Sequence, residues 1–443
     1  MTSAVETAVR PSRTSAGTAD YAQLKRLVAD RGLLERHPLR YVPQALALTL
    51  MIAGVAAGIG LFRASWWVLV WAAPAAFLFG QLGFLAHEAG HNQILRSSRR
   101  NHALGLFLFD LCLGGSAGWW AEKHNLHHAQ PNRLGVDPDI DGGPIAVSPI
   151  QLPGITGVGR RITRHQASAI WGLLPLEAFL IRLQTAEFML RRAGRNATVE
   201  AVLLLVHTAA YAAGLVLVLG VGRGLVFALV HQLLLGAYLG LAFLPNHTGM
   251  AVLEQDEEMD FLRRQVLTAR NLRAHPVTDY LTGVLSCQIE HHLFPRMPRS
   301  QLRRAAPLVR GFCEARGIAY RETGAFEAYA DIYRHLRTVA LPLRGRAVRA
   351  AADARPGSDD FVNLGQVTAG SVTVDMSPSP DHEDSTVEYA LKLIKVGGET
   401  RWALHDGRKV VGKLFETYGQ AAAERTRVQG REAAAAKLEA RAE

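Results

Sequence analysis

The sequence contains little cysteine, has fewer acidic than basic residues and lacks an apolar N-terminal segment. Only three cysteines, Cys112, Cys287 and Cys313, occur in 443 residues. They are too few and too widely spaced for a disulfide framework or a cysteine-ligated iron–sulfur cluster. Residues 1–20 are polar, without the hydrophobic core of a signal peptide. We therefore expect a disordered leader at residues 1–20 and a functional side that faces a reducing cytoplasm.

The charge balance is basic, with 49 Lys and Arg against 39 Asp and Glu and a formal net charge of +10. Such a charge would also suit a nucleic-acid-binding protein. However, the basic residues flank long apolar runs, where they would face anionic lipid headgroups. The mean hydropathy of +0.07 averages over these two kinds of segment. The pattern is typical of an integral membrane protein in a lipid bilayer, and it disfavours a soluble enzyme or a nucleic-acid partner.

Four nearly uncharged runs, at residues 43–62, 66–86, 201–220 and 224–245, are each long enough to cross the hydrocarbon core. Within each pair, the connection is very short and contains Arg63 or Arg223. The runs therefore predict four transmembrane helices arranged as two hairpins. Basic residues are abundant before residue 43 and after residue 91, so the positive-inside rule puts both ends of the hairpins in the cytoplasm.

Other apolar segments are too short or too charged to cross. Residues 21–41 predict a basic amphipathic helix on the membrane surface. Residues 104–120 carry Asp110 and predict a re-entrant or interfacial segment. A segment interrupted by Pro175 and charged at Glu177 predicts an interfacial helix. With a basic helical region up to about residue 343, these segments predict an all-α integral membrane protein with a cytosolic helical cap.

Histidines cluster at the predicted cytoplasmic ends of the apolar runs. The motifs are HEAGH, HNLHH, the lone histidine of LPNHTGM, and QIEHH, and their side chains are His87, His91, His124, His127, His128, His247, Gln288, His291 and His292. In HEAGH, the two histidines are at positions i and i+4 and share one face of a helix. By contrast, His207 and His231 lie inside apolar runs, where we expect neutral imidazoles that hydrogen-bond between helices.

HEAGH taken alone also matches the HExxH pattern of zinc proteases, in which the Glu is a general base. A zinc ion is satisfied by three or four protein ligands. Seven or eight converging nitrogens instead predict two first-row metal ions with room for oxygen. A redox-active metal pair beside a membrane-embedded substrate indicates activation of O2 for attack on an unreactive C–H bond, and iron is the expected metal.

The four motifs, HEAGH, HNLHHAQPNRLGVDPDID, the exit His247 and QIEHHLFPRMPR, resemble the histidine boxes of membrane fatty acid desaturases. The resemblance is to the front-end, linoleoyl-CoA-type branch, whose third box begins with Gln, and it covers roughly residues 20 to 345. It implies a di-iron site bound by His87, His91, His124, His127, His128, His247, His291 and His292. Gln288 would be a weaker or outer ligand, and the outer residues would be Asn125, Asp137, Asp139 and Glu290.

The resemblance also implies a reaction. Two electrons and O2 would be used to introduce a cis double bond into an acyl-CoA or acyl-lipid chain, in lipid metabolism at the cell or plasma membrane. No residue apart from the metal ligands is expected to be catalytic. Some front-end members carry a fused haem domain marked by HPGG, whereas this chain has only HPLR at His37 and HPVT at His275. Electrons are thus expected from a separate ferredoxin or flavoprotein reductase.

Beyond the desaturase-like region at residues 21–345, the composition changes. Residues 346–360 read as a linker. Residues 361–420, which include SVTVDM and VEYALKLIKV, alternate apolar and polar residues and predict a small β-rich appendage of unknown role. Residues 421–443 are charged and rich in alanine, which predicts a helical or disordered tail.

Two other functions use the same histidines. A fatty acyl or lipid hydroxylase or epoxidase would insert oxygen after the first hydrogen is removed. A metal-binding membrane receptor or transporter would need no catalysis, but it would place polar residues along a path within the spans. Here the histidines instead gather at the cytoplasmic ends.

Overall fold

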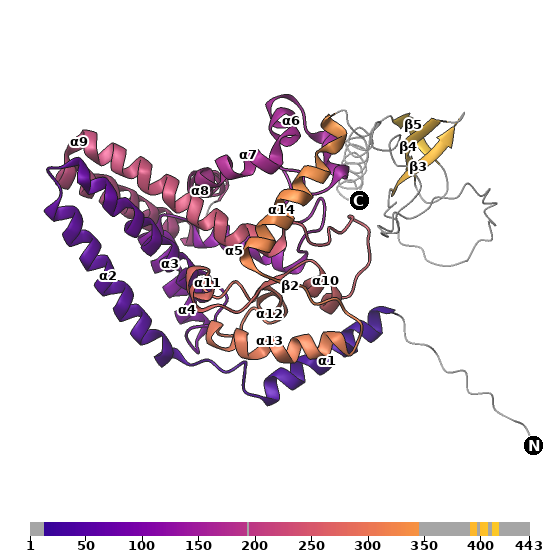
Figure 1. The fold of residues 1–443 in the computed structure, drawn as a ribbon, viewed down its shortest axis with the longest axis horizontal. Helices are drawn as coiled ribbons and strands as arrows, with labels where there is room; N and C mark the ends of the chain where they lie inside the picture. Colours follow the sequence, from indigo (N-terminus) through magenta and orange to yellow (C-terminus); the bar gives the residue numbers. More distant parts are fainter. Residues whose placement is uncertain (1–12, 193–194, 345–389, 397–398, 406–409, 416–443) are drawn as a thin grey trace, which may run out of the picture. The chain divides into compact units, whose positions relative to one another are not determined.

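The computed structural model describes residues 13–192, 195–344, 390–396, 399–405 and 410–415. The chain divides into two compact units, and the first contains residues 1–149 and 158–343. Helices dominate the described part of this unit. The three apolar helices α2 (Val42–Leu61), α3 (Ala72–Gly90) and α9 (Arg195–His247) lie side by side (Figure 1).

Three helical segments are long and apolar enough to cross a membrane: Pro38–Leu61, Trp66–Gly90 and Asn196–His247. The first two include the short helices η1 (Pro38–Tyr41) and η2 (Trp66–Trp71). Large apolar side chains of α2 and α9, such as Leu50 and Leu217, are strongly exposed. In water these side chains would form an unfavourable surface, whereas in a bilayer they would contact acyl chains.

The longest segment, α9, is two helices joined at Gly220. This glycine has φ 74° and ψ 166°, a conformation outside the helical region that only glycine adopts readily. The hydroxyl of Tyr211 lies 2.8 Å from Nδ1 of His231. In a continuous helix these residues would be about 30 Å apart, at 1.5 Å per residue. The chain therefore reverses near Gly220, as expected for two apolar runs joined by a short turn.

A bent element follows α3. It consists of α4 (Ser98–Leu106), the π-helix η3 (Phe107–Leu113) and α5 (Ala117–Ala129), and the helices bend by 113°. This shape agrees with the predicted re-entrant or interfacial segment. At the bend, Gly114 has φ 69°, and a Cβ there would be 2.4 Å from the His207 ring. His207 Nδ1 lies 3.0 Å from the carbonyl oxygen of Leu111, and so hydrogen-bonds between elements as predicted.

The predicted cap is a separate apolar core beneath these helices. It is built from α1 (Arg13–Asp30), α10 (Phe261–Leu267), α12 (Gln288–Leu293) and α13 (Arg299–Glu314). α1 begins at Arg13, inside the range predicted as a disordered leader. The apolar face of this amphipathic helix packs on the cap, because Leu24 and Val28 are fully buried against α10 and α13. Its location on the membrane surface stays a prediction.

Shorter elements complete the first unit. The 271–323 region contains a small parallel sheet in which β1 (Asn271–Leu272) pairs with β2 (Glu322–Thr323). The segment interrupted by Pro175 forms α7 (Gln166–Leu173), η5 (Leu174–Leu176) and α8 (Glu177–Arg191). Of these, η5 and α8 pack along α9. The remaining helices of this unit are α6 (Gly157–Arg164), α11 (Pro276–Leu281), α14 (Ala325–Val339) and η6 (Leu341–Arg344). Nearly all of η4 (Pro149–Gly154) belongs to the second unit.

The C-terminal region contains three antiparallel strands, β3 (Ala390–Val396), β4 (Glu399–His405) and β5 (Val410–Phe415). They pair in the order β3-β4-β5, with Ala390 opposite His405. These strands lie within residues 361–420, the range predicted as a β-rich appendage. The predicted linker, the SVTVDM segment and the alanine-rich tail lie outside the described residues.

The packing of α1 gives a stability prediction. Leu24 is fully buried, whereas Leu27 on the same helix is 37% exposed. We expect Leu24→Ala to destabilise the cap by about 2–5 kcal/mol, because it leaves a cavity in the core. Leu27→Ala should cost less than about 1 kcal/mol. Thermal unfolding of the purified protein would measure both, and equal effects would contradict the packing of α1 on the cap.

Candidate metal centre

Four elements bring the predicted ligands together. His87 belongs to α3 and His91 caps its C-terminus. α5 carries HNLHH, α12 carries QIEHH, and His247 is the last residue of α9. Residues four apart lie on the same face of a helix, whereas adjacent residues diverge by about 100°. The motifs H-x-x-H-H and Q-x-x-H-H therefore allow α5 and α12 each to present side chains in two directions.

The larger group is the five-histidine nest, which contains His87, His91, His124, His128 and His291. One ring nitrogen from each lies within 4.8 Å of all the others. His124 is central, because its Nε2 is 3.0 Å from the Nε2 atoms of three other histidines. The histidines at i and i+4 on α5, His124 and His128, both face this nest.

The smaller group is the three-histidine nest, which contains His127, His247 and His292. His247 Nε2 lies 3.3 Å from Nε2 of His127 and 3.1 Å from Nε2 of His292. Gln288 is one helical turn before His292 on α12, and its Nε2 is 3.0 Å from the same nitrogen of His247. The Gln288 Oε1 is buried without a hydrogen-bond partner in the described part of the chain, so a rotated amide could offer oxygen to this nest.

The two nests are adjacent. The His128 and His292 rings, one from each nest, stack with their centroids 4.2 Å apart and an interplanar angle of 17°. α5 supplies His127 to one nest and His128 to the other, and α12 divides His291 and His292 in the same way. The structure thus brings all eight predicted histidines together as two neighbouring groups.

Hydrogen bonding does not account for these contacts. A neutral imidazole nitrogen carries either one proton or one lone pair, so it forms one hydrogen bond. His124 Nε2 has three nitrogen neighbours at 3.0 Å. Two nitrogens bound at right angles to one metal ion, with metal–nitrogen bonds of about 2.1 Å, would be separated by about 3.0 Å. The spacing therefore fits ligands arranged around a metal ion.

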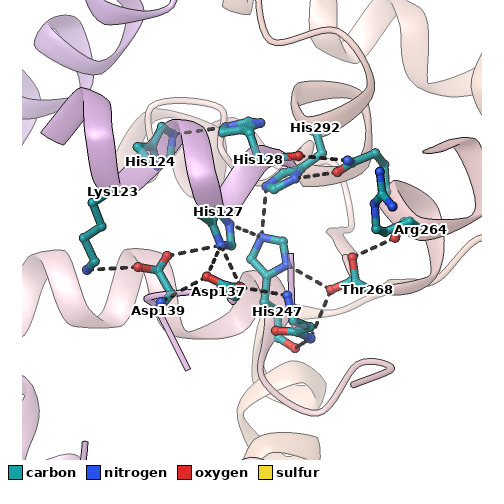
Figure 2. Close-up of polar contacts among 12 residues, drawn as sticks. Lys123, His124, His127, His128, Asp137, Asp139, His247, Arg264, Thr268 and His292 are labelled. Carbon is teal, nitrogen blue, oxygen red and sulfur yellow. Dashed lines mark hydrogen bonds and ion pairs between the residues drawn. The ribbon is translucent and has the colours of Figure 1, made fainter. Parts of the chain in front are cut away.

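The opposite ring nitrogens of the three-histidine nest are held by hydrogen bonds (Figure 2). His127 Nδ1 is 3.0 Å from both carboxylate oxygens of Asp137. His292 Nδ1 is 2.9 Å from Oε1 of Gln265, and His247 Nδ1 is 2.9 Å from the carbonyl oxygen of Thr268. Such bonds fix the tautomer, leaving Nε2 free to bind a metal. Gln265 and Thr268 were not predicted, since they lie in a charged segment with no recognisable motif.

The predicted outer residues have different positions. Asp137 is fully buried against His127, whereas Asp139 is 3.4 Å from His127 Nδ1 and pairs with Lys123 at 2.9 Å. Asn125 is exposed on α5. Glu290 is buried on α12, but it accepts hydrogen bonds from Asn271 and Tyr320, which tie this helix to the cap. Glu290 thus supports the helix that carries the third motif.

Burial affects the protonation of several histidines in the two nests. It lowers the pKa of His91, His291 and His292 well below the usual value, and the neighbouring histidines lower each pKa further by charge repulsion. These imidazoles are therefore neutral near pH 7. Neutral imidazole is the form that binds metals.

The surroundings of Glu88 in HEAGH do not fit the general base of a zinc protease. Glu88 is buried on α3, and its Oε1 lies 3.1 Å from Nε of Arg299. It belongs to neither histidine nest. The ion pair joins α3 to α13, so the Glu is engaged in packing, and the number of histidines exceeds what one zinc ion needs.

An aromatic wall borders the five-histidine nest and was also not predicted. Trp120 stacks on His124, with ring centroids 4.7 Å apart, and Phe109 stacks on Trp120, with centroids 5.0 Å apart. A Cβ at Gly90 would lie 2.1 Å from the Trp120 ring. The glycine of HEAGH is therefore required for the close approach of α3 and α5.

The fold and the site together define a helical membrane metalloprotein with a histidine-rich centre. The sequence model of the family Fatty acid desaturase matches residues 21–324, well over half of the chain. The chain therefore belongs to the fatty acid desaturase family. This family and the apolar helices indicate an integral membrane protein.

Several curated desaturases are similar to the chain. An acyl-lipid (9-3)-desaturase of Physcomitrium patens is 32% identical over 336 residues, which are 72% of this chain and 62% of the relative. The delta(6)-fatty-acid desaturase fat-3 of Caenorhabditis elegans is 27% identical, over 74% of this chain and 76% of its own length. A delta(8)-fatty-acid desaturase of Helianthus annuus is 27% identical, over 73% and 74%. These relatives confirm the predicted resemblance to desaturases of the front-end branch.

Gln265 allows a test of the site. Its amide accepts from His292 and donates to the carbonyl oxygen of His128. We expect Gln265→Leu to weaken metal binding about 10–100-fold, because the imidazole loses the group that orients it. The control is Gln301→Leu, since Gln301 is equally buried but bonds to Arg304. Metal retained after dialysis against a chelator would measure the effect, and equal retention in both variants would contradict this role.

Proposed function

We propose that the protein is an oxygen-dependent fatty acid desaturase that introduces a cis double bond into an acyl-CoA or acyl-lipid chain. The observation that carries this proposal is the pair of adjacent histidine nests, with His124 Nε2 at 3.0 Å from three other ring nitrogens. The desaturase activities named for the similar proteins support it. The chain spans about three fifths of the length of the Physcomitrium patens desaturase. The activity of the whole protein is therefore part of this proposal.

We propose two iron ions as the metals, held by the eight histidines, with Gln288 as a further ligand in the three-histidine nest. The donor set fits, since imidazole suits iron and the nests contain more nitrogens than zinc requires. Two iron ions bound here would supply, with O2, the oxidising power to remove hydrogen from unactivated carbons. The balanced reaction is –CH2–CH2– + O2 + 2 e⁻ + 2 H⁺ → –CH=CH– + 2 H2O.

The chain's own residues prepare this centre. Asp137, Gln265 and the carbonyl of Thr268 orient three imidazoles. Trp120 and Phe109 cover one side of the five-histidine nest with apolar surface, which excludes water. The acyl chain would reach the centre from the bilayer, so that its remote carbons contribute binding energy to the alignment of one methylene pair.

In the membrane, we propose four crossings in two hairpins, one formed by α2 and α3 and the other by the two halves of α9. The reversal at Gly220 and the contacts between α2 and α3 support this arrangement. The histidines would then face the cytoplasm, in keeping with the positive-inside rule. We further propose a desaturase domain at residues 21–345 and a separate ferredoxin or flavoprotein reductase as the electron donor.

Product analysis tests this function. The chain would be expressed with a ferredoxin and its reductase in a desaturase-deficient bacterium, and fatty acid methyl esters would be profiled. We expect a new double bond with the wild-type chain and loss of the product in His291→Ala/His292→Ala, because each nest loses one ligand. His102→Ala is the matched control, since His102 is exposed on α4 and should retain full activity.

Hydroxylated or epoxidised acyl chains in the same assay would contradict desaturation and favour oxygen insertion at the same site.

Metal analysis of the purified protein distinguishes catalysis from transport. We expect about two iron ions per wild-type chain, because eight imidazoles form two neighbouring nests. The iron content should be lower in His291→Ala/His292→Ala and unchanged in His102→Ala. A content of one zinc per chain would contradict the di-iron centre.

A further inference from the structure

A cavity of about 630 Å³ lies in the cap, and its lining includes the residue that directly follows His292. This volume is in the range of small-molecule sites. The lining comes from α1, the segment between α1 and α2, the residue Arg96 after the first motif, and residues 293–297 directly after His292. The lining thus includes residues from the segments that follow the HEAGH and QIEHH motifs.

Hydrogen bonds hold this lining in position. Gln93, two residues after His91, donates to the carbonyl oxygen of Pro295 at 2.8 Å. The Tyr21 hydroxyl donates to the carbonyl oxygen of Leu293 at 2.9 Å. Arg36 donates to the carbonyl oxygen of Arg96 at 2.8 Å. The first motif, the third motif and α1 are therefore joined at the cavity, which makes it a preformed feature of the cap.

The cavity combines an apolar floor with a cationic rim. Leu293, Phe294 and Met297 are buried and form part of the floor. The rim carries Lys25, Arg36, His37, Arg96 and Arg296, against one carboxylate, Glu35. Across the described part of the chain, the side chains of Lys25, Arg96 and Arg296 form no ion pair or hydrogen bond with another residue. Three cations are thus available to an anion from outside the chain.

We propose that this cavity binds the phosphate-bearing head of the acyl substrate. The inference rests on the proposed function, because both candidate carriers, CoA and a phospholipid, join the acyl chain to a phosphate group. Lys and Arg bind phosphate through charge-assisted hydrogen bonds. The apolar floor would hold the less polar part of the head. Binding here anchors the substrate beside the segments that follow His91 and His292, so the cavity helps set which carbons reach the metals.

The test compares two triple variants of the full-length protein in nanodiscs. The lining variant is Lys25→Gln/Arg96→Gln/Arg296→Gln. The control variant is Arg26→Gln/Arg31→Gln/Arg99→Gln, which removes the same charge from exposed positions that do not line the cavity. Arg36 is left intact because it bonds to the backbone. Equilibrium binding of stearoyl-CoA is measured without turnover, and the KM for desaturation of a nanodisc phosphatidylcholine is measured in parallel.

We expect the lining variant to bind stearoyl-CoA about tenfold more weakly than the control variant, or to show a KM for the phospholipid raised about tenfold. The first result identifies CoA as the source of the phosphate, and the second identifies the phospholipid. Equal values for the lining and control variants in both assays would overturn the proposal. Unchanged iron content would show that the lining variant is folded.

The two assays distinguish an incorrect proposal for the cavity from an incorrect proposal for the enzyme activity. Weaker stearoyl-CoA binding by the lining variant, with no double bond formed by the wild-type chain, would support the cavity and contradict the desaturase. Normal desaturation with equal binding and KM in both variants would contradict only the cavity.

Discussion

The approach of several imidazole nitrogens to about 3 Å of one another is the constraint on which the rest of the structure depends. Without a shared cation, such an arrangement would bury unpaired lone pairs and protons, at a cost of several kcal/mol. Helices α3, α5, α9 and α12 all end or pass at this point. The apolar helices and the cap therefore serve to hold eight side chains in fixed positions.

Much of this arrangement could be predicted from the sequence. Apolar runs of membrane length and motifs with i, i+4 spacing have strong physical signatures. They indicated the main helices and the eight histidines that the structure brings together. The packing of α1 was harder to predict from the sequence. The burial of Leu24 depends on partners in α10 and α13, which are more than 200 residues away in sequence. An amphipathic helix has the same pattern whether its apolar face meets lipid or protein.

The groups that orient the imidazoles could also be predicted only in part from the sequence. Asp137 was predicted because it lies close to HNLHH in sequence, and it contacts His127. Gln265 orients His292 from a segment without a motif, and the Thr268 contribution comes from its backbone carbonyl, which any residue type would supply. Asn125 is adjacent to His124 but exposed, because neighbouring residues on a helix point in different directions. Sequence proximity to a ligand is thus a weaker guide than tertiary contact.

The division of α5 and α12 between the two nests has a consequence for how the protein is made. The five-histidine nest takes ligands from α3, α5 and α12, so its last ligand, His291, is synthesised only after both halves of α9. A ribosome-bound chain that ends before α12 offers an incomplete set of donors in both nests. A metal centre held by these histidines would therefore be completed late in biogenesis, after both halves of α9 and α12 have been translated.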